Sequence, residues 1–557
     1  MLPHGEKKQR QRESERTITS MTAKDSFLPW ILLGCIIAFL VFVRIRILAT
    51  PLERDEGEYA YIGQLFLQGV PPYAEAFTMK LPGTSMMYAL FMLLFGQTIS
   101  VIHLGLLLVN VASTFLIFLL TKKWLDASSA IISSFSFVLL SLSPYLLGFA
   151  AHATHFVILF SLLGTLVLLQ ALETKKGSRI FFSGILFGCA FLMKHPGIFF
   201  FMFGLSLLGI HLMKEHFSKK NIVQFSIWLT GGFLVPLFSI FLLAYLGGTL
   251  KNLWFWAVQS ALFYGTDISF SQGLMKLSRM LLLFRSVLPL FCIAIVIGIP
   301  LVFAGKILDL TKNILLLFGL YSFLALLPGL YFRDHYFILI LPACCLFIGG
   351  GFHVVQHFLE HSYGWKYIPS LAVVMMMGAN IYTNRDYYFT LSPDDIVRSY
   401  YGINYFVESL PISKYLAEHT SPEERIAVIG SEPQIFFYTQ RRSVSGYIYM
   451  YGMMEPQPFA RRMQEEFIAD VEHARPNYLV FFGLTCSWGD DAASDLRIFV
   501  WNRNYTSTYY HPVGVIDFVN RHDIRYIWGH AAQQYIPVSS EHIIIYKRTG
   551  IENAHGR

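Results

Sequence analysis

The stretch FLPWILLGCIIAFLVFV at residues 27–43 runs into RIRILATPLERDEGEY at residues 44–59. The first part carries no charge and approaches the length that crosses the roughly 30 Å hydrocarbon core of a bilayer. The second part ends with four carboxylates and one arginine within the six residues 53–58. Charged groups at the membrane edge are costly to keep there, so they are candidates for function. Together the two parts predict an integral membrane protein that carries out chemistry at one membrane face.

Apolar segments continue along most of the chain. Hydrophobic residues make up 54% of the sequence and charged residues only 14%, whereas roughly a quarter of the residues in a soluble domain are charged. The predicted spans are residues 27–48, 100–121, 130–150, 154–172, 180–194, 197–213, 223–247, 280–304, 313–331, 335–355 and 366–383. The composition excludes a soluble protein, and the pattern predicts a polytopic α-helical membrane protein with about eleven transmembrane helices.

Positive charges indicate how these spans are oriented. A basic tail at residues 1–26 precedes the first span, and the alternate loops between spans are basic as well. Their lysines and arginines are Lys122, Lys123, Lys175, Lys176, Arg179, Lys214, Lys219, Lys220, Lys306, Lys312 and Lys366. Because cytoplasmic loops are enriched in positive charge, we expect the N-terminus and these loops in the cytoplasm. An odd number of spans then places the C-terminal region outside the cytoplasm.

Three segments on the predicted outer side are long. Residues 49–99 hold the acidic cluster and an apolar run, Met86–Phe95, which is too short to span and is typical of an interfacial helix. Residues 248–279 carry aromatic anchors of the kind found at the headgroup level. We therefore predict a transmembrane domain at residues 27–383, with its catalytic loop at 49–99, and a separate outer domain at residues 384–557.

Charged residues and turn residues return in the outer domain. Arg425–Gly430 and Asn477–Gly483 have the pattern of buried strands, and the amphipathic stretch Phe459–His473 between them is typical of a helix. A further strand pattern, His542–Lys547, lies near the end of the chain. Strands that alternate with helices predict an extracytoplasmic α/β domain.

The first outer loop contains groups of opposite charge. Asp55 lies just beyond the first span, where a carboxylate can accept a proton from a hydroxyl group. Glu56 and Glu58 would raise its pKa if all three lie close together. Lys80 can hold a lipid phosphate, and Pro82-Gly83 forms a turn behind it. The alternatives are a solvated acidic loop and a lysine that reaches out to the membrane surface.

Two other outer segments carry candidate ligand-binding groups. Arg333-Asp334-His335-Tyr336 opens the tenth predicted span, where arginine can bind a phosphate through two hydrogen bonds. The alternative is an interfacial anchor patch. His152 and His155 follow the third span and can hold a metal together with the acidic cluster, the alternative being polar residues at a helix end.

A second histidine set occurs on the predicted cytoplasmic side. His353, His357 and His361 recur every four residues and would share one face of a helix. Glu360 is the one carboxylate beside them in the sequence, so an interfacial polar face is favoured over a metal site. The sequence assigns no cofactor, with a divalent metal left open at the outer face.

Three motifs near the first span carry a family resemblance. They are Arg54-Asp55-Glu56-Gly57-Glu58-Tyr59, Gly69-Val70-Pro71-Pro72-Tyr73 and Met79-Lys80-Leu81-Pro82-Gly83. In their order and spacing the chain resembles the GT-C-fold glycosyltransferases. Within these it is similar to bacterial protein O-mannosyltransferases and lipid A aminoarabinose transferases. It departs from them at Leu81, where relatives often have proline, and at residues 150–155, which lack the acidic residue of some relatives.

The resemblance implies inverting transfer of a sugar from a polyprenyl phosphate to a hydroxyl group outside the cytoplasm. The acceptor would be a protein, a lipid or a cell-envelope glycan, and the compact architecture implies a bacterial inner membrane. Asp55 would be the general base, positioned by Glu56. The implied donor phosphate site comprises Lys80, Arg333, His335 and Tyr336.

Further candidates for contact with the acceptor or the sugar are Glu58, Tyr59, Tyr73, His152, His155 and Glu432. No aromatic residues interleave with the basic clusters, so a nucleic-acid partner is not indicated. The alternative function is a transporter or flippase for a lipid-linked sugar, which requires charged residues deep within the spans. Most charges here gather at one face, and that asymmetry favours an interfacial enzyme.

Overall fold

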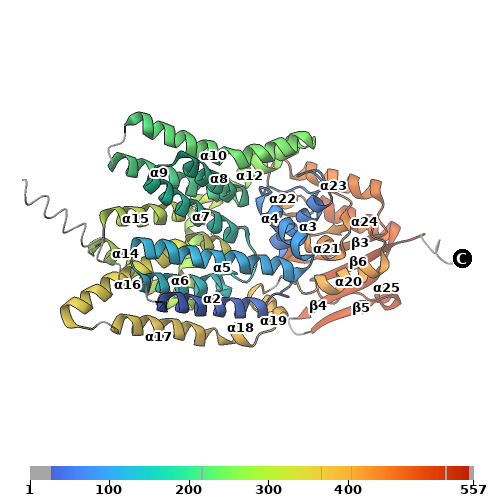
Figure 1. Cartoon of the computed structure of the whole chain (residues 1–557). Helices are drawn as coiled ribbons and strands as arrows, with labels where there is room; N and C mark the ends of the chain where they lie inside the picture. Colours follow the sequence, from blue (N-terminus) through green and yellow to red (C-terminus); the bar gives the residue numbers. More distant parts are fainter. Residues whose placement is uncertain are drawn as a thin grey trace, which may run out of the picture.

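The computed structural model describes residues 27–550 except 215–217, 267, 306, 366, 403 and 521–522. It has a helical part joined to a smaller domain that contains a sheet (Figure 1). The predicted basic tail at 1–26 and the loop lysines Lys306 and Lys366 lie outside the described residues.

The helical part holds a helix at each predicted span. Its helices are α2 Leu28–Arg46, α3 Arg54–Leu67, α4 Gly83–Phe95, α5 Ile99–Trp124, α6 Ala127–Ser141, α7 Ala153–Thr174, α8 Gly177–Met193, α9 Ile198–Lys214, α10 Lys219–Leu246, α11 Leu250–Trp254, α12 Ala261–Thr266, α13 Phe270–Val287, α14 Pro289–Ala304, α15 Asp309–Leu324, α16 Leu341–Tyr363 and α17 Ile368–Thr383. Among the described residues, six helices are long and apolar enough to cross a membrane, or seven if the bent pair of α13 and α14 counts as one span. The structure therefore confirms the predicted polytopic helical class and leaves the number of crossings open.

One predicted span is not a continuous helix. Residues 280–304 divide between α13 and α14, which meet at an angle of 110°. The bend lies at Leu288, immediately before Pro289, and a residue before proline is disfavoured in the α conformation. The apolar composition on both sides of the break hides it from a sequence reading.

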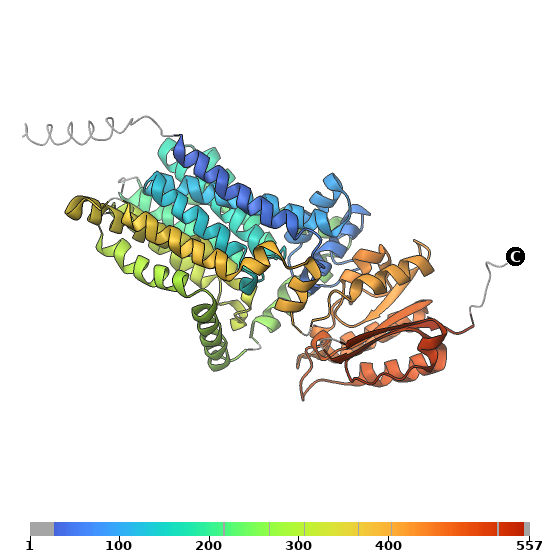
Figure 2. The same cartoon turned by 90° about the horizontal axis from the view of Figure 1, so that it is seen from below.

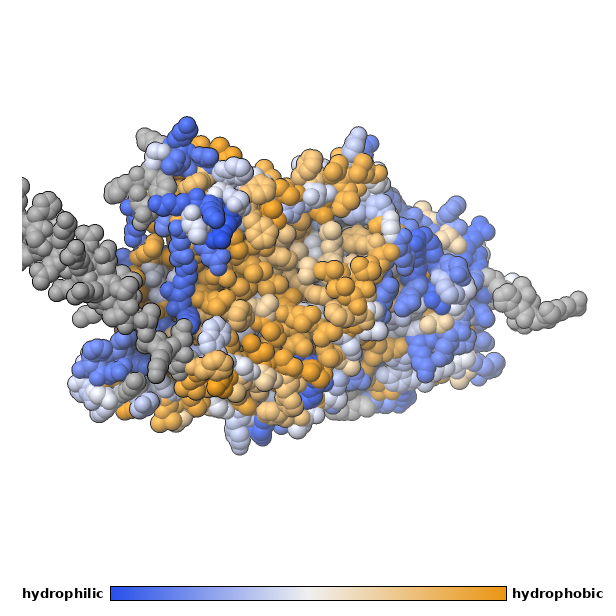
Figure 3. All heavy atoms as spheres, in the orientation of Figure 1, coloured by the Kyte–Doolittle hydropathy of each residue, from blue (hydrophilic) through white to orange (hydrophobic). Residues whose placement is uncertain are grey.

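Large apolar side chains remain exposed over much of the helical surface. Trp228, Phe238 and Leu242 on α10, with Ile293 and Val296 on α14, are examples. Figure 3 shows an apolar belt across the visible face of the helical part, with polar residues over the sheet domain and at the opposite end. A soluble protein rarely exposes an apolar surface of this extent, so the belt is the face that contacts lipid.

A mixed six-stranded sheet forms the C-terminal domain. Its strands are β1 Arg425–Ile429, β2 Arg442–Ser443, β3 Tyr478–Gly483, β4 Tyr510–Asn520, β5 Asp523–Trp528 and β6 His542–Arg548. They lie in the order β2-β1-β3-β6-β4-β5, with β1 parallel to both of its neighbours and the other pairs antiparallel. The predicted α/β domain is confirmed, and β2, β4 and β5 were not anticipated.

Helices surround this sheet and lead into it from the bundle. They are α18 Arg385–Phe389, α19 Pro393–Tyr400, α20 Ser409–His419, α21 Gln434–Thr439, α22 Tyr451–Met454, α23 Ala460–Ala474, α24 Arg497–Tyr509 and α25 His530–Gln534. Figure 2 shows the sheet domain against the end of the bundle where the first outer loop lies.

The first outer loop packs directly on the sheet domain. A Cβ at Gly57 of α3 would lie 2.5 Å from the backbone nitrogen of Gln434, so α3 and α21 approach closely because Gly57 has no side chain. The backbone nitrogen of Phe77 donates to the carbonyl oxygen of Gly446 at 2.7 Å. The space between the bundle and the sheet domain is therefore bounded by fixed backbone on both sides.

Candidate active site

A cavity of about 900 Å³ lies where the bundle, the first outer loop and the sheet domain meet. Its charged lining is Asp55, Glu58, Lys80, Lys194, Arg333 and Glu455. Much of the remaining wall is apolar, with side chains such as Phe191, Leu237, Ile240 and Phe241 from α8 and α10. A pocket with a small charged group at one end and an extended apolar wall suits a lipid with a charged head.

Lys80 is the centre of the charged lining. Its Nζ lies 2.7 Å from Oδ1 of Asp55 and also donates to Oε2 of Glu58. The same ammonium lies 4.7 Å from the ring centre of Tyr59 and 5.4 Å from that of Tyr449. Glu58 is buried, whereas the side chain of Asp55 keeps 22% of its surface exposed to the cavity. Asp55 is therefore the carboxylate of this group that a ligand can reach.

The charges in this cluster shift one another's pKa values. Burial raises the pKa of Asp55, but Lys80, His152 and Lys194 together outweigh burial and hold the pKa well below its usual range. Burial also raises the pKa of Glu58, where Lys80 only partly opposes it. Without a ligand, then, Asp55 is a firmly ionised carboxylate and a weak base.

The first turn of α3 fixes the position of Asp55. Glu53 caps the helix by accepting from the backbone nitrogen of Glu56 at 2.9 Å, and the side chain of Glu56 accepts in return from the backbone nitrogen of Glu53. Glu56 Oε1 also lies 3.0 Å from His103 and accepts from the backbone nitrogen of Ala151 at 2.6 Å. Glu56 does not line the cavity, so its contacts hold the helix start on which Asp55 stands.

Cations from three parts of the chain face the cavity. Arg333 precedes the 3₁₀ turn Asp334–Ile340 at the start of α16, and Lys194 follows α8. Lys194 Nζ lies 3.8 Å from the ring centre of Tyr336, another cavity residue. Burial lowers the pKa of Lys194 to about 7. The positive charges of Lys80 and Arg333 also lower this pKa, whereas the negative charge of Asp55 raises it. Together with Lys80, these groups can bind an anion such as a phosphate.

A histidine pair borders the same cluster. The rings of His152 and His335 stack with their centres 4.0 Å apart. One ligand atom from each of Asp55, His152 and His335 lies within 4.8 Å of the others. Neither ring nitrogen of buried His152 makes a hydrogen bond among the described residues, and its Nδ1 lies 3.6 Å from Oε1 of Glu53. Two imidazoles and one carboxylate form a donor set that suits a divalent metal such as Zn²⁺.

Four of the predicted contact residues do not line the cavity, and one of them is His152 of the stacked pair. Tyr73 is buried, and its hydroxyl donates to the carbonyl oxygen of Lys80 at 2.9 Å. His155 is fully buried within α7. Glu432 is 2% exposed and forms an ion pair with Arg54 at 2.9 Å. These side chains are enclosed by protein, and their contact with the acceptor or the sugar stays a prediction.

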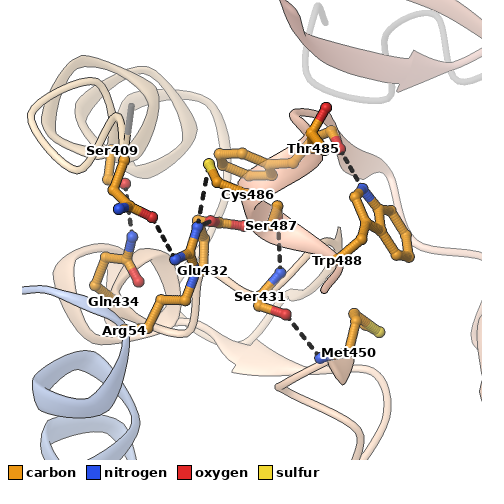
Figure 4. Close-up of polar contacts among 12 residues, drawn as sticks. Arg54, Ser409, Ser431, Glu432, Gln434, Met450, Thr485, Cys486, Ser487 and Trp488 are labelled. Carbon is orange, nitrogen blue, oxygen red and sulfur yellow. Dashed lines mark hydrogen bonds and ion pairs between the residues drawn. The ribbon is translucent and has the colours of Figure 1, made fainter. Parts of the chain in front are cut away.

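The ion pair of Glu432 belongs to a chain of hydrogen bonds that crosses between the domains (Figure 4). Arg54 donates to Glu432, which accepts from the hydroxyl of Ser487. Ser487 Oγ in turn accepts from the backbone nitrogen of Ser431 at 2.8 Å, and Ser431 Oγ accepts from that of Met450 at 3.0 Å. The chain of contacts ends at the segment 449–457, six residues of which line the cavity.

The candidate site drawn from the sequence omits Lys194, and the sequence offers Tyr449 and Tyr451 only as part of a sugar- or acceptor-binding surface of the outer domain. Lys194 follows directly on an apolar helix, and a lysine there was a usable signal, because charges at the ends of spans are functional candidates. Tyr449 and Tyr451 come from the sheet domain and line the cavity beside Lys80. No pattern near these tyrosines indicates that they lie against residue 80.

The family described as dolichyl-phosphate-mannose-protein mannosyltransferase matches residues 79–245 of the chain. No curated protein sequence matches this chain. The solved structure of ArnT from Cupriavidus metallidurans bound to undecaprenyl phosphate is similar, with a TM-score of 0.54, 14% identity and coverage of 82% of this chain and 93% of that one. The transmembrane part has a GT-C fold.

Archaeal structures are similar to this chain as well. The oligosaccharyltransferase of Archaeoglobus fulgidus, tethered to an acceptor peptide with the NVT sequon, has a TM-score of 0.53 and 12% identity. The match covers 92% of this chain and 75% of that one. The same organism's AglB in complex with an inhibitory peptide and a dolichol-phosphate has a TM-score of 0.50 and 13% identity. That match covers 93% of this chain and 76% of that one. The resemblance that was drawn from the three sequence motifs is thereby confirmed.

Proposed function

We propose that the protein is a glycosyltransferase that moves a sugar, with inversion, from a polyprenyl-phosphate donor to a hydroxyl group of an acceptor outside the cytoplasm. The observation that carries this proposal is that a reachable carboxylate, three cations and an extended apolar wall meet in one cavity. The matched family and the GT-C fold support the same class of reaction.

The donor would bind with its phosphate among the cations Lys80, Lys194 and Arg333. Its prenyl chain would lie along the apolar wall that α10 contributes, where burial of each methylene contributes about 0.8 kcal/mol. Cations fixed around the phosphate stabilise the negative charge that the leaving polyprenyl phosphate acquires in the transition state.

Asp55 would act as the general base of the transfer. The hydroxyl oxygen of the acceptor attacks the anomeric carbon, and its proton passes to Asp55. The bond between that carbon and the phosphate oxygen breaks, and its electron pair stays on the phosphate. When the donor phosphate draws Lys80 toward itself, Asp55 loses part of the charge that lowers its pKa. Donor binding therefore strengthens the base at the point where it is needed.

A divalent metal would be held by Asp55, His152 and His335, and when bound it would supply positive charge beside the donor phosphate. The residues of the chain provide the remaining parts of the site. Tyr59 and Tyr449 border Lys80 on two sides, and the buried Glu58 holds its ammonium.

The proposed topology follows from the site. The basic loop residues that the structure describes include Lys122, Lys175 and Lys312. They lie at one end of the helical bundle, and Asp55, Lys194 and Arg333 lie at the other end. Positive loops face the cytoplasm, so the cavity and the sheet domain would face the outside of a bacterial inner membrane.

Arg333→Ala is expected to weaken the binding of undecaprenyl phosphate by about 10- to 100-fold, because a hydrogen bond to a charged group contributes about 1.5–3 kcal/mol. Binding of fluorescent undecaprenyl phosphate to the purified protein in nanodiscs measures this. Arg285→Ala is the matched control, since Arg285 on α13 does not line the cavity. Equal weakening by both substitutions would remove Arg333 from the phosphate site.

Donor binding is expected to weaken as the pH rises above about 7. Lys194 carries its proton below its pKa of about 7 and loses it above. A phosphate favours the protonated form, so above pH 7 binding must be accompanied by proton uptake, which lowers the affinity by up to about tenfold per pH unit. A titration of a polyprenyl-phosphate sugar between pH 6 and pH 9 tests this. Lys194→Met should flatten the profile, and an unchanged profile in that variant would contradict the assignment.

A further inference from the structure

Three side chains that commonly bind metals meet far from the cavity. One ligand atom from each of Asp126, His353 and His357 lies within 4.8 Å of the other two. His353 stands on α16, which leads away from the sheet domain (Figure 1). It is 18 residues beyond His335, or roughly 30 Å along a helix. The proposed transfer reaction therefore makes no use of this cluster.

Close packing of α6 against α16 brings the three residues together. Ser133 Oγ on α6 donates to the carbonyl oxygen of Cys345 on α16 at 3.0 Å. A Cβ at Gly349 would lie 2.1 Å from Ser133 Oγ, so the helices can approach this closely only at a glycine. Because the two helices run in opposite directions, the next turn of α16 places His353 beside Asp126, where α6 begins.

Local contacts hold the carboxylate and the two imidazoles in place. Asp126 caps α6 and accepts from the backbone nitrogen of Ser129 at 2.8 Å. Its other oxygen lies 2.5 Å from Nδ1 of His353. His353 and His357 are four residues apart on one helical face, with ring centres 4.5 Å apart. His361 lies one turn further on, and its Nδ1 lies 2.8 Å from the carbonyl oxygen of His357.

We propose that Asp126, His353 and His357 form a second, separate binding site for a divalent transition metal of the Zn²⁺ type. Two imidazoles and one carboxylate are a ligand set that such ions accept, with the fourth position left to water. In tetrahedral geometry with bonds of about 2.0–2.1 Å, the ligand atoms lie about 3.3 Å apart. Rotation of the exposed His357 side chain would close the distance. The bound ion would join α6 to α16.

The test uses the full-length protein in nanodiscs, stripped with a chelator and titrated with Co²⁺. All variants carry His152→Ala, which removes a ligand of the cluster at the cavity. Asp126→Asn keeps the helix cap, because asparagine caps as well as aspartate, and His357→Ala alters an exposed residue. His361→Ala is the matched control on the same helix.

The site predicts one equivalent of Co²⁺ bound in the His152→Ala protein, with the visible absorption of a tetrahedral ion. Adding Asp126→Asn or His357→Ala should weaken binding at least about tenfold, whereas adding His361→Ala should not. Since an ion that binds the folded state raises the melting temperature, Co²⁺ should raise it in the control and not in those two variants. Equal Co²⁺ binding in all of these proteins, or none in the His152→Ala protein, would overturn the proposal.

Discussion

Asp55→Asn is expected to lower sugar transfer by about 10²- to 10⁴-fold, the usual effect of losing a general base. Asparagine has nearly the same shape, and Lys80 keeps Glu58 as an ion-pair partner, so the fold should persist. The assay is transfer of radiolabelled sugar from a polyprenyl-phosphate donor in proteoliposomes, alongside the melting temperature of the purified protein. Polyprenyl-phosphate binding should change far less than turnover, because the cations of the phosphate site remain.

Glu75→Gln is the matched control for Asp55→Asn. Glu75 is a carboxylate of the same outer loop, but it pairs with Arg425 and Arg442 of the sheet domain and does not line the cavity. The control should transfer sugar at nearly the wild-type rate. Full activity in Asp55→Asn, or equal losses in both variants, would rule out Asp55 as the base.

Arg54→Met is expected to weaken the docking of the sheet domain on α3 by about 3–5 kcal/mol, the cost of leaving one partner of a buried ion pair without the other. The side chains of Arg54 and Glu432 are only 8% and 3% exposed. Arg54 also donates to Asn404 at 2.7 Å. A lower melting temperature and faster proteolysis between the bundle and the sheet domain would measure the loss.

Two further variants distinguish the buried pair from a general surface effect. Arg461→Met breaks the exposed pair of Arg461 with Glu465, and such pairs contribute little. It should leave melting and proteolysis nearly unchanged. Arg54→Met combined with Glu432→Leu should recover part of the loss, because no buried charge is then left without a partner. If Arg54→Met and Arg461→Met behave alike, the chain of contacts from Arg54 to the cavity wall does not hold the domains together.

The parts of the fold that follow local patterns were predictable. Long apolar segments gave the helices, and alternating strands and helices gave the C-terminal domain, including β1, β3 and β6. The edge strand β5 was missed because only its last three residues, Tyr526–Trp528, form a continuous apolar run, which is too short to indicate a strand. The bend at Leu288 was missed because apolar residues lie on both sides of it, Met280–Phe284 before it and α14 after it.

The candidate site was predictable where its residues lie in motifs that are close together in the sequence. It was not predictable where tertiary contacts bring distant residues together. Asp55 and Lys80 are 25 residues apart and were placed together from one loop. Glu432 reads as a polar turn residue, yet it is buried against Arg54, 378 positions away. For the histidines of α16 the sequence offers only Glu360 as a nearby carboxylate, because Asp126 reaches them from a helix 227 positions earlier.

The sheet domain contributes to the cavity as well as enclosing it. Tyr449 lies beside Lys80, and Tyr451 donates from its hydroxyl to the carbonyl oxygen of Cys486 at 2.6 Å. The wall of the cavity beside Lys80 is therefore built partly from the sheet domain. Differences in this wall offer a physical basis for sugar and acceptor selectivity on a common fold.

The most direct test of the central claim is the fate of a doubly labelled donor in proteoliposomes that contain the wild-type protein. Polyprenyl-phosphate sugars labelled in the sugar and in the lipid would be supplied with a mixture of envelope acceptors. The account predicts that the donor is cleaved, with free polyprenyl phosphate appearing together with sugar bound to acceptor. Intact donor that moves between leaflets without any cleavage would contradict the account and establish a transporter instead.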